Sequence, residues 1–79
     1  MSEIHTLYIS GLVRGRMALD GPTGQTLSTG HPVMLYQQYE DPCWIPGHVE
    51  NEADRAWFVP DGGSWRDSKV ELEQGQIVQ

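Results

Sequence analysis

The chain has 79 residues, with eleven acidic and five basic side chains and a formal net charge of −6. A chain of this length forms one small domain, which spans residues 1–79 and buries about 60–65% of its unfolded surface. Clustered Lys and Arg side chains supply most of the affinity for nucleic-acid backbones. The charge therefore disfavours nucleic acid as a partner and favours a basic one.

The cysteine content and the first residues favour a cytoplasmic protein. Cys43 is the single cysteine, so no disulfide framework can form, which suits a reducing compartment. Residues 1–5 lack the basic and apolar regions of a secretory signal. No run of residues approaches the ~18 apolar residues of a membrane-spanning helix. We therefore expect a soluble, cytoplasmic protein that makes no membrane contact.

Glycine and proline recur along the whole chain and leave no window for a long helix. Short segments between them have period-two or wholly apolar character, which is typical of strands. In chain order, we expect strands at residues 6–13, 16–19, 32–37, 43–50, 56–60 and 69–72, polar loops at 20–24 and 51–55, and one helical turn at 64–68. The tail 73–79 is expected to add an edge pairing through Ile77-Val78 or to fray.

The stretch from Cys43 to Glu50 organises the rest of the chain. Its side chains alternate between two faces, one small and apolar (Cys43, Ile45, Gly47, Val49), the other aromatic and then polar (Trp44, Pro46, His48, Glu50). Because proline has no N–H to donate to a ladder, we expect Pro46 at an edge or a bulge.

Five to six short strands in a chain of this length predict an all-β fold. Closing the sheet limits the unpaired edges that invite aggregation. The sequence therefore predicts first a small SH3-like barrel and second a strongly curled antiparallel sheet.

Short motifs in this pattern resemble a known family. They are Gly15-Arg16-Met17-Ala18-Leu19, then Leu27, Gly30 and Val33, then Trp44-Ile45 with Gly47-His48-Val49-Glu50, and Trp57-Phe58-Val59. They are similar to a bacterial family of small SH3-like domains of unknown function, often carried by phages and other mobile elements. The chain departs from that family at His48, where a more basic residue is usual, and in its long loop 20–26. The resemblance implies the fold and no particular activity.

The sequence offers little for catalysis or metal binding. Cys43 and His48 lie five positions apart, so on one strand they point to opposite faces and cannot act as nucleophile and base. Cys43 is expected to be buried as a small hydrophobe. The histidines His5, His31 and His48 lack the close spacing of zinc ligands. We expect no enzyme activity, no metal and no cofactor.

Aromatic residues give the candidate binding site, because Trp and Tyr are enriched where protein surfaces meet. The SH3-like fold implies an aromatic groove beside acidic loops that takes Pro-rich or basic peptides. The residues expected to form it are Tyr39, Trp44 and Trp57 with Glu40, Asp41 and Glu50. The alternative is that Trp57 and Phe58 pack in the core.

The function expected from these residues is a non-enzymatic protein-interaction module that binds a basic partner or a second copy of itself. The alternative is a small nucleic-acid-binding barrel that uses Arg14, Arg16 and exposed aromatic rings for stacking.

Overall fold

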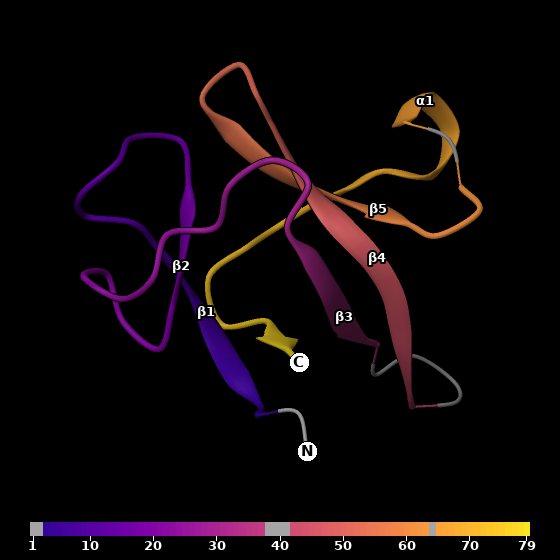
Figure 1. Cartoon of the computed structure of the whole chain (residues 1–79), viewed down its shortest axis with the longest axis horizontal. Coiled ribbons are helices and arrows are strands. Elements are labelled where there is room, and N and C mark those ends of the chain that lie inside the picture. The colour runs from indigo at the N-terminus through magenta and orange to yellow at the C-terminus, as the bar shows by residue number, and fades with distance from the viewer. Residues whose placement is uncertain (1–2, 38–41, 64) are drawn as a thin grey trace.

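The structure of the chain, a computed structural model, describes residues 3–37, 42–63 and 65–79, and within these the side chains of Trp65 and Arg66 are not described. The fold is all-β, with seven strands in one antiparallel sheet (Figure 1). The elements are β1 (His5–Ile9), β2 (Met17–Leu19), β3 (Pro32–Gln37), β4 (Cys43–Glu52), β5 (Arg55–Pro60), the helical turn α1 (Trp65–Ser68), β6 (Val70–Glu71) and β7 (Ile77–Val78). No helix in this part of the chain is long and apolar enough to cross a membrane.

The C-terminal segment takes part in the sheet at two separate places. The strand order is β2-β1-β7-β3-β4-β5-β6, so β6 lies at one edge while β7 lies between β1 and β3. Val78 pairs with both His5 and Leu35 and is 1% exposed. The segment expected to add an edge pairing or to fray therefore pairs in the interior of the sheet.

The sheet is open and strongly curled, as the second of the two sequence predictions had it, and the closed barrel predicted first is not formed. One edge strand, β6, has only two residues, and the chain turns away after it through a Glu73–Gln76 backbone hydrogen bond. The other edge, β2, is covered by a bridge between Ala18 and Thr26. The described residues form seven strands, against five to six expected; the additional one is β7, whose two residues are too few to show a period.

Pro46 lies within β4 at the point where the pairing with β5 ends: residues 43–46 have ladder partners on β3 alone, so Pro46 stands at a local edge, as predicted. It is tolerated because its nitrogen points to the position where the ladder between β4 and β5 ends. That ladder ends with the pair Gly47–Pro60, and the N–H of Asp61 donates to the Pro46 carbonyl at 2.9 Å. The reciprocal bond is the one that a proline cannot make.

The core packs on the concave side of the curled sheet. Among the described side chains, Phe58 is the largest that is fully buried. It packs with buried aliphatic residues from across the sheet: Leu7, Met17, Leu27, Val33, Leu35, Val49, Ala56, Leu72 and Val78. Gly47 faces this side, and a Cβ at that position would lie 2.6 Å from Cζ of Phe58 and closer still to the Val59 carbonyl. The phenyl ring therefore occupies the space that a side chain at residue 47 would need.

We predict that Gly47→Ala lowers the free energy of unfolding by about 1–3 kcal/mol, because the methyl group overpacks the core against backbone that cannot move. Gly11→Ala is the matched control, since a Cβ there meets only ordinary contacts at 3.6 Å with Pro22. It should change the stability by less than about 0.5 kcal/mol. Urea denaturation of the two variants and the wild type measures the difference, and equal stabilities would contradict the packing described.

Candidate functional site

The convex face of β3, β4 and β5 carries those residues of the predicted binding site that the structure describes. Trp44 and Glu50 alternate onto this face of β4, and Trp57 lies opposite Glu50 on β5. The other predicted members, Tyr39, Glu40 and Asp41, lie outside the described residues.

The structure separates the two tryptophans that the sequence assigned to one groove. Trp44 is paired with Tyr36 on β3, whereas Trp57 is paired with Glu50. Trp44 and Glu50 are six positions apart on β4, a distance of about 20 Å along an extended strand. The two rings lie on the same face of the sheet but have different neighbours.

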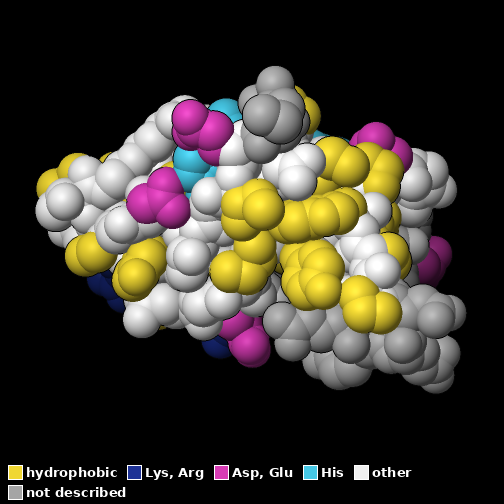
Figure 2. All heavy atoms as spheres, turned by 90° about the horizontal axis from the view of Figure 1, so that it is seen from below, with side chains coloured by type: hydrophobic (Ala, Val, Ile, Leu, Met, Phe, Trp, Pro, Cys, Tyr) yellow, Lys and Arg dark blue, Asp and Glu magenta, His cyan; other side chains and the backbone are white. Residues whose placement is uncertain are grey.

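Around Trp44 the convex face is apolar. The rings of Tyr36 and Trp44 lie with centroids 5.0 Å apart at an interplanar angle of 54°. Met34 and Pro46 form the next cross-strand pair on the same face. These four residues, named here the Trp44 face, are half-buried or exposed. Figure 2, which views the molecule from below relative to Figure 1, shows hydrophobic side chains gathered on this end of β3 and β4.

A shallow depression of about 190 Å³ adjoins the Trp44 face. Met34 and Pro46 line it together with Asp61. The backbone of Asp61 is held there by the hydrogen bond from its N–H to the Pro46 carbonyl. A carboxylate therefore stands beside an apolar surface, which suits a ligand that combines an apolar group with a cation.

A second depression, of about 440 Å³, follows further along β4. Its lining residues are His48, Glu50, Asn51, Glu52, Val59 and Gly63. Within it, Nε2 of His48 lies 3.0 Å from Oε1 of Glu50, at hydrogen-bonding distance. Glu52, at the end of the strand, is exposed. The convex face of β4 therefore changes from aromatic to acidic along its length.

Trp57 lies among paired charges. The Nζ atom of Lys69 is 4.7 Å from the centroid of its ring, a cation–π contact. Beside it, Nη1 of Arg55 donates to Oε1 of Glu71 at 3.1 Å. Because the ring is half-buried and already covered by a cation, Trp57 contributes to the packing of this end of the sheet.

Sequence reasoning missed four residues at the Trp44 face and the depression beside it: Met34, Tyr36, Pro46 and Asp61. Alternation along residues 32–37 places Met34 and Tyr36 on one face and was a usable signal. Their proximity to Pro46 and Asp61 depends on the register of β3 and β5 against β4, which no local pattern specifies.

The arginines of the alternative nucleic-acid reading lie on the loop between β1 and β2, away from the Trp44 face (Figure 1). The side chain of Arg14 is 90% exposed, and its Nε is 3.7 Å from Oδ2 of Asp54. The exposed apolar neighbours in this loop are the aliphatic residues Leu12 and Val13, which have no ring to stack on a base. The structure does not bring the arginines and the Tyr36–Trp44 pair together.

Cys43 is exposed, so the expectation that it is buried is wrong. It begins β4, at the end of the strand that extends past the core. His48 alternates onto the opposite face of the strand. Within residues 3–37, 42–63 and 65–79, no group of three or more His, Cys, Asp or Glu side chains is placed to hold a metal ion.

A separate polar contact ties the start of β1 to the turn after β2. Nδ1 of His5 donates to Oδ2 of Asp20 at 2.6 Å, and Oδ1 of Asp20 accepts the N–H of Thr6 at 3.1 Å. The hydrogen bond from His5, followed by the one from the Thr6 backbone, lowers the pKa of Asp20 below its ordinary value of 3.8.

No protein-family model, curated protein or solved structure matches the chain. The resemblance to the family of small SH3-like domains therefore stays a prediction from short motifs.

We predict that the carboxyl group of Asp20 titrates below pH 3.8 and that His5→Leu moves its midpoint back towards this value. Because the pKa is lowered in the folded state, the contact stabilises the fold above pH 3.8 and is lost as the pH falls through the lowered pKa. Carbon-13 NMR of the carboxyl resonance measures the midpoint. His31→Leu is the control and should leave it unchanged, and an unshifted midpoint in the wild type would contradict the contact.

Proposed function

We propose that the chain is a non-enzymatic protein-interaction module that binds a partner protein through the Trp44 face. The observation that carries this proposal is the Tyr36–Trp44 ring pair, which lies on a regular part of the sheet and is only half-buried. Aromatic rings bury a large area at low entropic cost and keep a polar tip for hydrogen bonding. They are therefore enriched at the centres of protein interfaces.

The position of the pair supports a role in binding more than a role in folding. Phe58 and the aliphatic residues of the core pack on the concave side of the sheet, beside an open pocket of about 770 Å³. The Trp44 face lies on the other side, where Met34 and Pro46 extend it into a contiguous apolar surface. Contiguous apolar surface on a small protein typically marks an interaction site.

We also propose that the partner is basic. The net charge is −6, and Asp61 stands beside the Trp44 face. Complementary charge raises the association rate and excludes partners of the same sign.

The finer fold assignment is a proposal as well: the curled sheet is a variant of the SH3-like fold. The motifs behind the family resemblance coincide with its strands, since residues 15–19 contain β2, Trp44 to Glu50 lie in β4, and Trp57 to Val59 lie in β5. This coincidence supports the proposal that the open sheet and the SH3-like fold share one arrangement of strands.

We predict that Trp44→Ala abolishes capture of the partner while the domain stays folded. The half-buried ring should cost about 1–2 kcal/mol of unfolding free energy, less than the ~3–5 kcal/mol lost with a fully buried tryptophan. The measurement is affinity capture from an extract of the native cells, compared between variants by quantitative mass spectrometry.

Trp57→Ala is the matched control, because it removes the same side chain from the other end of the same face. A protein captured by the wild type and by Trp57→Ala, and lost with Trp44→Ala, supports the proposal. If Trp44→Ala unfolds the domain, or if Trp57→Ala alone loses the partner, the Trp44 face is not the docking surface.

A further inference from the structure

We infer that the partner is held as an extended segment along β4, with an apolar side chain on the Trp44 face and Lys or Arg side chains over the acidic end of the strand. This inference rests on the proposed function and specifies the chemistry of the partner.

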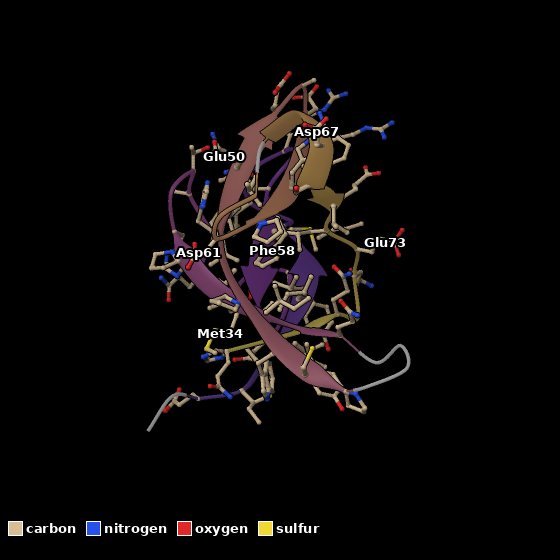
Figure 3. The ribbon with its side chains drawn as sticks, turned by 90° about the vertical axis from the view of Figure 1, so that its right-hand side faces the viewer. Met34, Glu50, Phe58, Asp61, Asp67 and Glu73 are labelled. Atoms are coloured by element: carbon tan, nitrogen blue, oxygen red, sulfur yellow. The ribbon has the colours of Figure 1, made fainter. Side chains whose placement is uncertain are left out.

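The shape of the convex face carries the first step. The depression at Met34, Pro46 and Asp61 and the depression at His48, Glu50 and Glu52 follow each other along one strand. Figure 3 shows Met34, Asp61 and Glu50 in a column on one side of the molecule, with Phe58 inside and Glu73 on the opposite side. A ligand that occupies both depressions must therefore be long, narrow and aligned with β4.

The charges carry the second step. Within residues 3–37, 42–63 and 65–79, neither Asp61 nor Glu52 has an ion-pair partner, whereas the nearby Glu71 is paired with Arg55. Among the residues whose side chains the structure describes, none that lines the two depressions is Lys or Arg. The acidic groups are thus available to a cation from outside, and an anionic segment would be repelled.

The spacing carries the third step. Glu50 and Glu52 lie four and six residues beyond Pro46 on the same face. An extended segment advances about 3.3 Å per residue, as β4 does. Basic side chains about four to six residues from the apolar anchor therefore reach these carboxylates, while one close to the anchor reaches Asp61.

A phage-displayed library of random peptides of about ten residues, the length that spans β4, tests the inference. The library is selected in parallel on the wild type and on Trp44→Ala. We expect the wild type to enrich peptides with an aromatic or aliphatic anchor and Lys or Arg at the spacing given above, and Trp44→Ala to enrich none of them.

The affinity of the most enriched peptide is then measured by fluorescence anisotropy. Glu52→Lys and Asp61→Lys should each weaken binding about tenfold, because each replaces an attraction by a repulsion. Glu73→Lys is the control, since it makes the same charge change on the opposite side of the molecule, and it should leave the affinity within about twofold.

Each outcome of these measurements supports or overturns the inference. Enriched peptides with the anchor but no basic preference, or equal affinities for Glu52→Lys and Glu73→Lys, overturn the inference and leave the Trp44 face as a docking surface. If the wild type enriches no peptide over Trp44→Ala, the inference and the proposed role of the Trp44 face as a docking surface are both overturned. Light scattering that shows a dimer of the wild type and a monomer of Trp44→Ala assigns the face to a second copy and also overturns the inference.

Discussion

The contact between the ring of Phe58 and the backbone of Gly47 is the constraint on which the rest of the structure depends. A seventy-nine-residue chain has few large side chains for its core, and Phe58 is the largest that is fully buried among the side chains the structure describes. The ring reaches the centre of the curled sheet because residue 47 has no side chain on that side. β4 can then pair with β3 and β5 at once and still curve around the core.

The convex face follows from this arrangement. Alternation along β3 and β4 directs Tyr36 and Trp44 to the side of the sheet opposite Phe58, where the ring pair lies half-buried. Along β4 this apolar surface gives way to the carboxylates of Glu50 and Glu52. A single strand therefore presents an anchoring region and a charged region at a fixed spacing, which is the property that recognition of an extended basic segment requires.

Local patterns predicted the strands well where they are long, and residues 32–37 are a strand with the expected bounds. They were wrong where tertiary contacts determine where a strand ends. The polar residues Asn51 and Glu52 were expected in a loop, but β4 includes them, and the turn is made by Ala53 and Asp54 with positive φ angles of 52° and 61°. The site was only partly predictable, because alternation gives the face of a side chain and not its register. Alternation placed Trp44 on the outer face of β4, but its separation from Trp57 and its neighbours on β3 follow from strand pairing.

The contact between the ring of Phe58 and Gly47 can be observed directly by NMR. In a NOESY spectrum of the folded protein, the ring protons of Phe58 should show strong cross-peaks to the α-protons of Gly47 and to none of the residues on the convex face of β4. Absence of the Gly47 cross-peaks, or cross-peaks from the Phe58 ring to Trp44 or Pro46, would contradict the arrangement of both faces of the sheet.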